Sequence, residues 1–115
     1  MKRPETITAD FIKILDNHLD KIVSGETDTY LEIGDMAALL HIHPTHLSNT
    51  IKATTGKSPC DICNDKTIER AQKLLQDKSL TIASIAMLLT YEPTNFTKYF
   101  KKHTGQTPLQ YRSSL

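Results

Sequence analysis

Hydrogen-bonding and basic side chains gather in two short stretches of the 115-residue sequence. In each stretch, two apolar residues four positions apart mark the buried side of a helix: Leu47 and Ile51, then Phe96 and Phe100. The outward side chains carry hydroxyl, amide, imidazole and ammonium groups, which can bond to the edges of DNA bases. These outward residues are Thr45, His46, Ser48, Asn49 and Lys52 in the first stretch and Thr94, Asn95, Thr97, Lys98, Lys101 and Lys102 in the second.

Both stretches belong to an internal repeat. A shift of 49 positions, from Ile33 to Ile82, aligns glycine with glycine and proline with proline. The identical pairs are Ile33/Ile82, Ala37/Ala86, Leu39/Leu88, Leu40/Leu89, Pro44/Pro93, Thr45/Thr94, Lys52/Lys101, Gly56/Gly105 and Pro59/Pro108. Conservative pairs such as Met36/Ile85 fill positions between them. The repeat indicates a duplicated helical unit.

Apolar periodicity predicts an all-α fold of about seven helices, and no segment alternates as a strand would. The first helix is expected after a tail at residues 1–7, with Thr8 as its N-cap, Asp10 in its first turn and Gly25 at its end. Its apolar stripe consists of Phe11, Ile14, Leu15, Leu19, Ile22 and Val23.

Each copy of the repeat predicts two short helices joined by a tight turn. Proline suits the first position of the second helix, and glycine suits the left-handed residue that follows its end. The predicted helix, turn and helix occupy residues 33–40, 41–43 and 44–56 in the first copy and 82–89, 90–92 and 93–105 in the second.

A longer helix at residues 59–77 lies between the copies and is expected to connect them. A last short helix begins at Thr107-Pro108. The predicted organisation of residues 8–115 is therefore a first helix-turn-helix subdomain at 8–57, a linker helix at 59–77 and a second subdomain at 79–113.

Charge is unevenly distributed although the net charge is only +1. Residues 1–35 carry four basic and eight acidic groups, whereas residues 36–115 carry ten basic and five acidic groups. The lysines of the second stretch form either a solvated helix face or a set of phosphate contacts, and the fold context favours the contacts. No apolar run reaches the ~20 residues that span a bilayer, there is no secretory signal, and two cysteines predict a reducing, cytoplasmic setting.

Two short helices with a sharp turn form the helix-turn-helix pattern. The second helix is narrow enough to enter the ~12 Å major groove, where its outward side chains meet base edges. Asparagine can pair with adenine and lysine can donate to guanine. Two such units at equal spacing, both with hydrogen-bonding residues outward, favour DNA binding over an ordinary helical hairpin.

The sequence resembles the DNA-binding domain of the AraC/XylS family of transcription regulators from Thr8 to Arg112. The family's signature is present as I-x-x-I-A at Ile82–Ala86 and as F-x-x-x-F-K-K-x-x-G-x-T-P-x-x-Y-R from Phe96 to Arg112. The segment E-R-A-Q-K-L-L at Glu69–Leu75 also resembles the family. The sequence departs from the family where Thr90 replaces the usual glycine and where Asn49 replaces a frequent arginine, so we expect no guanine contact at Asn49.

The resemblance implies two homeodomain-like three-helix units that insert into successive major grooves, about 34 Å apart. It places Thr45, Ser48 and Asn49, and then Thr94, Thr97 and Lys98, against bases. It also places the helix starts near Glu32 and Thr81 on phosphates. Further implied are an activator rather than a repressor, contact with RNA polymerase, no cofactor, and a parent protein with a separate sensing or dimerisation domain.

Other interpretations rest on cysteine and histidine. Cys60-x-x-Cys63 could be a redox, metal-binding or thiol-responsive pair, but Cys63 falls where the linker helix needs an apolar residue. His41, His43 and His46 could bind a metal, or they could be solvated residues of a turn. A protein-interaction module that kept the fold without DNA binding is a third class. No residue set suggests a catalytic site, so we expect no enzyme.

Overall fold

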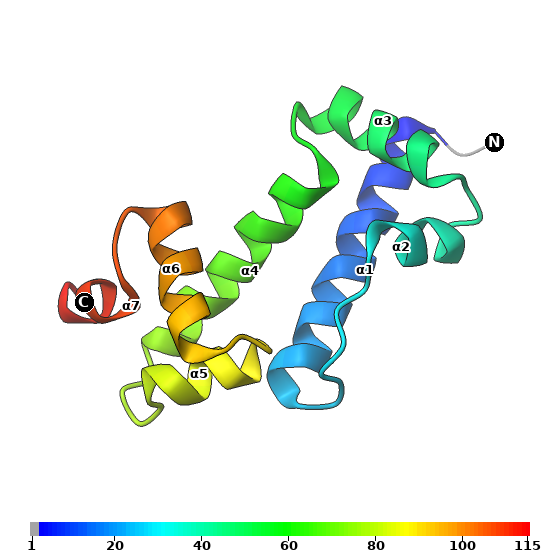
Figure 1. Ribbon diagram of the computed structural model, residues 1–115. Helices are drawn as coiled ribbons and strands as arrows, with labels where there is room; N and C mark the ends of the chain where they lie inside the picture. Colours follow the sequence, from blue (N-terminus) through cyan, green and yellow to red (C-terminus); the bar gives the residue numbers. More distant parts are fainter. Residues whose placement is uncertain (1–2) are drawn as a thin grey trace.

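The computed structural model describes residues 3–115, and within that range the chain forms seven helices and no strand (Figure 1). The all-α prediction is confirmed. The helices are α1 Pro4–Ser24, α2 Ile33–Leu39, α3 Pro44–Thr55, α4 Pro59–Leu75, α5 Ile82–Leu88, α6 Pro93–Thr104 and α7 Pro108–Ser113.

The start of α1 differs from the prediction. Thr8 is not its N-cap, because the helix begins at Pro4 and Arg3 is the cap residue. Pro4 is pre-set for the first helical position, and Ile7, only 3% exposed, extends the apolar stripe by one turn. The Thr8 hydroxyl donates to the carbonyl of Pro4 and lies 2.6 Å from the Thr54 hydroxyl of α3. Residues 4–7 are therefore part of α1 and Arg3 is its cap, whereas residues 1–2 of the predicted tail lie outside the described residues.

Most other boundaries follow the proline and glycine signals. Proline occupies the first turn of α3, α4, α6 and α7, and Gly25, Gly56 and Gly105 end their helices in left-handed geometry. The linker helix α4 stops at Leu75 rather than at residue 77. The Asp77 carboxylate accepts hydrogen bonds from the amide and hydroxyl of Ser79, which stabilises a turn there instead of another helical residue.

Two hydrophobic cores lie along the molecule, and α1 and α4 enter both. Phe11, Leu15 and Leu19 of α1 belong to the first core, whereas Ile22 belongs to the second. In α4, Ile62 packs in the first core and its later apolar residues pack in the second. The last turn of α1, which the predicted first subdomain at residues 8–57 includes, therefore packs in the second core. A helix of 21 residues is long enough to reach past its own subdomain.

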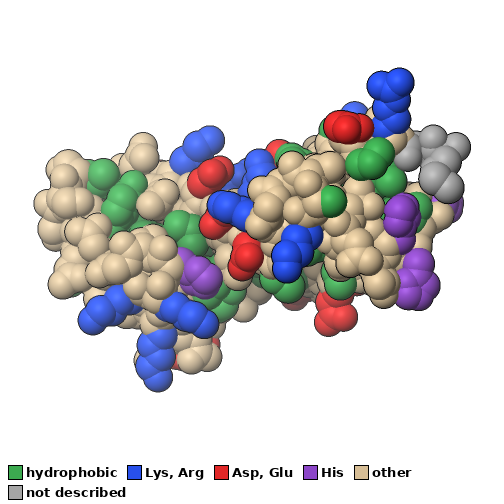
Figure 2. Space-filling view, turned by 90° about the horizontal axis from the view of Figure 1, so that it is seen from above, with side chains coloured by type: hydrophobic (Ala, Val, Ile, Leu, Met, Phe, Trp, Pro, Cys, Tyr) green, Lys and Arg blue, Asp and Glu red, His purple; other side chains and the backbone are tan. Residues whose placement is uncertain are grey.

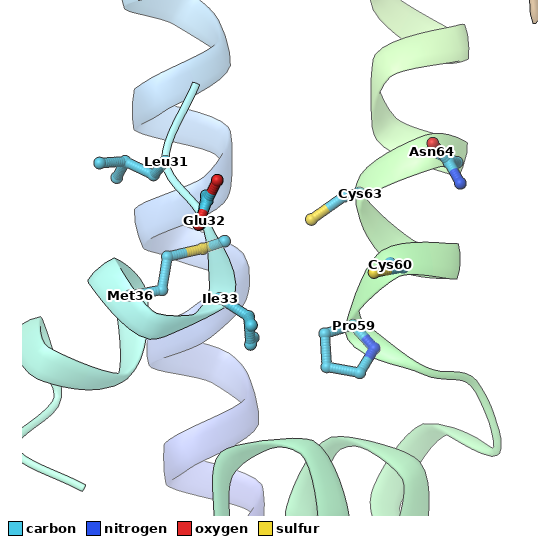
Figure 3. A pocket seen from close by; sticks show the side chains of 8 residues that line it. All are labelled: Leu31, Glu32, Ile33, Met36, Pro59, Cys60, Cys63 and Asn64. Atoms are coloured by element: carbon cyan, nitrogen blue, oxygen red, sulfur yellow. The ribbon is translucent and has the colours of Figure 1, made fainter. Parts of the chain in front are cut away.

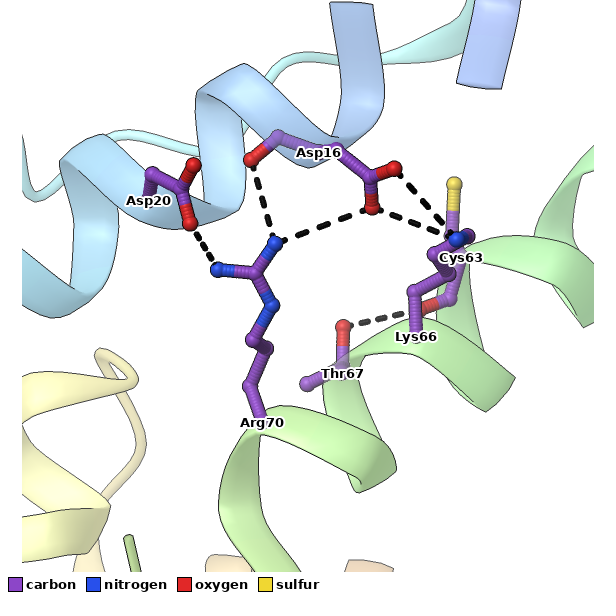
Figure 4. Close-up of polar contacts among 6 residues, drawn as sticks. All are labelled: Asp16, Asp20, Cys63, Lys66, Thr67 and Arg70. Atoms are coloured by element: carbon purple, nitrogen blue, oxygen red, sulfur yellow. Dashed lines mark hydrogen bonds and ion pairs between the residues drawn. The ribbon is translucent and has the colours of Figure 1, made fainter. Parts of the chain in front are cut away.

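Polar contacts fix how α1 lies against α4 (Figure 4). Asp16 pairs with Lys66 at 3.2 Å and with Arg70 at 3.7 Å, and Arg70 also pairs with Asp20. A further hydrogen bond runs from Arg70 to the backbone carbonyl of Asp16. Because two helices exchange several contacts from adjacent turns, sliding or rotation of one against the other would break more than one of them.

Tyr30 joins the loop before α2 to the second unit. Its ring packs against both cores, and its hydroxyl donates to the carbonyl of Leu89 over 2.9 Å. Burial raises the pKa of Tyr30 to about 12, so the hydroxyl keeps the proton that it donates at neutral pH. The connection between the units is thus threefold: α4, the end of α1, and Tyr30.

The Tyr30→Phe variant should be less stable by about 1 kcal/mol, because it leaves the partly buried Leu89 carbonyl without its donor. Urea unfolding followed by circular dichroism measures the loss. Tyr111→Phe is the matched control, since Tyr111 is also partly buried and its hydroxyl makes no recorded hydrogen bond within residues 3–115. Equal losses in the two variants would contradict the role given to the Tyr30 hydroxyl.

Glu92 should make the stability of the chain depend on pH. Its carboxylate caps α6 by accepting hydrogen bonds from the amides of Thr94 and Asn95, and these bonds lower the pKa of Glu92 below 4.5. A carboxyl with a lowered folded pKa stabilises the fold above its unfolded pKa and loses that contribution as pH falls through the folded pKa.

The wild type should therefore exceed Glu92→Gln in free energy of unfolding near neutral pH, and the difference should shrink below about pH 4.5. Thermal unfolding at a series of pH values measures it. Glu69→Gln, at an exposed carboxylate in the interior of α4, is the control. A Glu92→Gln difference that stays constant down to pH 3 would contradict the capping role.

Candidate nucleic-acid interface

The turns before α3 and α6 share one backbone geometry. His41 and Thr90 both adopt left-handed conformations, with φ of 58° and 66°. The amides of Ile42 and Tyr91 then donate to the carbonyls of Ala37 and Ala86, five residues earlier in each case. Glycine adopts this conformation with less strain than threonine. Thr90 nevertheless adopts this conformation. The turn before α6 therefore has the same backbone geometry as the turn before α3.

The two helices are capped by different side chains at equivalent positions. The Nδ1 atom of His43 accepts a hydrogen bond from the amide of Thr45 at the start of α3. At the start of α6, the Glu92 carboxylate accepts hydrogen bonds from the first backbone amides of that helix. Neither cap is predicted from the sequence, because neither histidine nor glutamate is among the preferred N-cap residues. The available signal was their position directly before a proline that begins a helix.

The predicted contact residues lie on the outer sides of α3 and α6. Leu47, Ile51, Phe96 and Phe100 are fully buried, so the opposite face of each helix is turned to solvent. The exposed members are Thr45, His46, Asn49 and Lys52 on α3 and Thr94, Asn95, Lys98, Lys101 and Lys102 on α6.

Ser48 and Thr97 occupy equivalent positions and are only partly exposed. Thr97 donates its hydroxyl hydrogen to the carbonyl of Pro93, which leaves its oxygen as an acceptor. The structure thus brings the predicted residues of each unit together on one surface, with Ser48 and Thr97 at its edge.

Positive charge is concentrated on α6. Lys98 and Lys102 stand where α3 has Asn49 and Ala53, so α6 carries three exposed lysines and α3 carries one, Lys52. Figure 2 shows Lys and Arg side chains close together at the end of the molecule that holds α6 and α7, with a His side chain beside them and further His side chains at the opposite end.

Many other basic groups are engaged within the fold. Lys57 pairs with Asp65, and Lys66 and Arg70 pair with α1. Arg112 donates to the carbonyls of Leu75 and Asp77 and so ties α7 to the end of α4. In the described part of the chain, none of the lysines of α3 and α6 has a recorded ion pair. Lys98 is nevertheless close enough to Glu92 to contribute to the lowered pKa of that carboxyl. The small net charge is therefore compatible with a lysine-rich surface on α6, because many of the other basic groups are paired within the fold.

The starts of α2 and α5 differ in charge. At α2, Glu32 and Asp35 form a capping box, and Asp35 accepts a hydrogen bond from the amide of Glu32 over 2.9 Å. Two carboxylates at this helix start repel a phosphate and already occupy its amides, which argues against the phosphate contact expected near Glu32. At α5 the cap is the neutral Thr81, whose hydroxyl accepts from the amide of Ser84.

The two cysteines differ in burial, and the metal-site interpretation of the cysteines and of His41, His43 and His46 can be compared with the structure. Cys63 is partly buried against the first core, and burial raises the pKa of its thiol to about 11, with the nearby Cys60 as a smaller cause. Cys60 is exposed. Within residues 3–115 no three His, Cys, Asp or Glu side chains are placed to hold a metal ion. None of the helices in this range is long and apolar enough to cross a bilayer.

Comparison with solved structures finds the same fold in transcription regulators. A transcriptional regulator from Chromobacterium violaceum with an AraC-type DNA-binding domain has a TM-score of 0.81 at 18% identity, covering 96% of this chain and 92% of that one. The C-terminal domain of AraT, a response regulator from Geobacillus stearothermophilus, has a TM-score of 0.70 at 29% identity, covering 89% and 85%. The DNA-binding domain of AdpA, solved in complex with a target DNA, has a TM-score of 0.67 at 18% identity, covering 84% and 91%.

The sequence comparison agrees with the structural one. No curated protein matches the sequence. Residues 36–114, however, match the family described as a helix-turn-helix domain, a span that includes α3, the linker helix and the whole second unit. The chain belongs to this helix-turn-helix family and is an AraC-type double helix-turn-helix domain.

Proposed function

We propose that the chain is a sequence-specific transcription regulator that places α3 and α6 in two successive major grooves on one side of a DNA duplex. The observation that carries this function is the equivalence of the two units. Each presents a capped 12-residue helix with a buried apolar side and an outer side of hydroxyl, amide and ammonium groups. The family match and the AdpA domain in its DNA complex support the same assignment.

The dimensions of the molecule fit two grooves. Its longest extent is 48 Å, and major grooves on one face of B-DNA recur about every 34 Å. One chain is therefore long enough to engage both without a second copy. Because α1, α4 and Tyr30 hold the units together, the distance between the recognition helices is already fixed in the absence of DNA.

The two recognition helices contribute differently to the affinity and to the sequence specificity of DNA binding. The lysines of α6 supply the larger share of phosphate attraction, which is independent of sequence. On α3, Asn49 and Thr45 are uncharged hydrogen-bonding groups and Lys52 is the one exposed lysine, so the contribution of this helix depends more on which bases it meets. We assign sequence discrimination mainly to α3 and affinity mainly to α6.

The biological setting follows from this function. A regulator of this kind acts in the cytoplasm, where the bacterial chromosome lies, and activates transcription through contact with RNA polymerase. The sensing or dimerisation domain expected in the parent protein would determine when the DNA-binding domain acts.

Selection of sites from a random duplex library tests the proposal, and the enriched duplex should carry two short motifs about 34 Å apart. Asn49→Ala should lose about 1–3 kcal/mol of binding on that duplex and almost nothing on random DNA. Failure to enrich any sequence, with weak and salt-sensitive binding alone, would favour a protein-interaction module. Equal losses on both duplexes would contradict the role of Asn49 as a base contact.

Lys101→Ala should weaken binding to every duplex by a similar factor and reduce the slope of log K against log salt by about 1, as expected for one lost phosphate contact. Fluorescence anisotropy at several salt concentrations measures both quantities. Lys13→Ala is the matched control, because Lys13 is an exposed lysine on α1, outside both recognition helices. A salt slope that changes equally in both variants would show that the effect is one of net charge and not of contact.

A further inference from the structure

A cleft of about 430 Å³ lies between the start of α2 and the first turns of α4 (Figure 3). Small-molecule sites in proteins have volumes of about 300–1,000 Å³ and mainly apolar walls. The walls of this cleft are formed by Leu31, Ile33, Met36, Pro59, Cys60 and Cys63, with Glu32 and Asn64 as the polar members. None of these residues is among the DNA contacts proposed above, so the cleft has no role in that function.

Two free thiols share one wall of the cleft. Cys60 is the second residue of α4 and is exposed, and Cys63 follows one turn later and is partly buried. In Figure 3 both sulfur atoms lie on the side of α4 that faces α2. Helical residues three positions apart are surface neighbours, with Cβ atoms about 5–6 Å apart. The two cysteines therefore form a dithiol that opens into an apolar space.

The surroundings of the dithiol narrow the class of ligand. A structural zinc ion needs four ligands, and within residues 3–115 no third His, Cys, Asp or Glu side chain completes a metal site here. Burial raises the pKa of Cys63 to about 11, so its sulfur keeps a hydrogen at neutral pH. Two adjacent thiols in an apolar cleft favour a ligand that bonds to both sulfurs, displaces their hydrogens as it binds, and carries an apolar group. A trivalent organoarsenical meets all three conditions.

The cleft adjoins the recognition helix of the first unit. Cys60 also lines a neighbouring hollow of about 250 Å³, together with Ser48, Asn49 and Lys52 of α3. A group held by Cys60 would thus stand beside the side chains that α3 presents to DNA. Because a helix nearly fills the ~12 Å major groove, an added group at this place would obstruct its entry.

We propose that Cys60 and Cys63 form a dithiol site for a trivalent organoarsenical, and that its occupation excludes α3 from the major groove. On binding, two sulfur–arsenic bonds form and two arsenic–hydroxyl bonds break, and each hydroxyl leaves as water with one thiol hydrogen. No electron transfer is involved. The effect on DNA rests on the function proposed above, whereas the dithiol site does not.

Phenylarsine oxide is the probe for the site. The reduced chain should bind one equivalent, detected by mass spectrometry, and lose both thiols in a titration with a chromogenic disulfide. A dithiol such as dithiothreitol should reverse the binding, whereas a monothiol at equal thiol concentration should not. Cys60→Ser and Cys63→Ala should each abolish stable binding while circular dichroism confirms that they fold. Equally tight binding to either single variant would overturn the dithiol site.

The effect on DNA is measured with the duplex enriched by selection. Loading with phenylarsine oxide should lower affinity at least about tenfold, dithiothreitol should restore it, and Cys60→Ser should keep its affinity in the presence of the probe. Unchanged affinity of the loaded chain would overturn the exclusion of α3. If the unloaded chain binds no duplex, the proposed function fails instead, and the thiol titration still decides whether the dithiol site exists.

Discussion

The placement of the two recognition helices depends on the packing of α1 against α4. Each of these helices contributes apolar side chains to both cores, so neither unit can move as a rigid body without exposing part of the other. Exposing a side chain such as Ile22 costs about 1.5–3 kcal/mol. The Asp16, Lys66 and Arg70 ion pairs are partly solvated, and pairs of that kind contribute about 0–1 kcal/mol each. Apolar burial therefore holds the helices together, and the ion pairs chiefly fix their register.

This arrangement also explains how a nearly neutral chain can present a basic surface. Asp16 and Asp20 are matched by Lys66 and Arg70 within the fold, and Lys57 is matched by Asp65. Pairing removes these groups from the long-range field that a phosphate backbone would experience. Within residues 3–115 the lysines of α6 form no such ion pair, and only Lys98 is close enough to Glu92 to contribute to the lowered pKa of that carboxyl. Net charge was consequently a poor guide to function, whereas the position of each charge along the chain was informative.

Local signals in the sequence were sufficient for the number and order of the helices within residues 3–115 and for the outer faces of α3 and α6, although the start of α1 and the end of α4 were misplaced. Pro44 and Gly56 set the limits of α3 because each acts through its own backbone geometry, and the same holds for Pro93 and Gly105. The assignment of side chains to one core or the other depends on long-range packing, which local signals do not show. Ile22 continues the same apolar stripe as Leu19, and nothing in the stripe shows that the two side chains enter different cores.

The candidate site was predictable to a similar extent. Burial of Leu47 and Phe96 follows from helical periodicity, so the outward residues could be named. The cleft beside Cys60 could not, because its walls come from segments that lie far apart in the sequence. The caps His43 and Glu92 were missed for another reason, since their residue types rarely serve at that position.

Comparison of the two copies shows which features the duplicated unit must keep and which it can change. The left-handed turn, the proline start and the buried pair recur in both copies, because each sets the direction of the recognition helix. The outer face changes from Asn49 to Lys98 and from Ala53 to Lys102 without cost to packing, since all four positions face solvent. Because the turn, the proline start and the buried pair are kept while the outer side chains can change, the two copies can diverge. One recognition helix then suits phosphate attraction and the other suits base contacts. Because the packing of α1 against α4 fixes the separation of the two recognition helices, both act on one side of the same duplex.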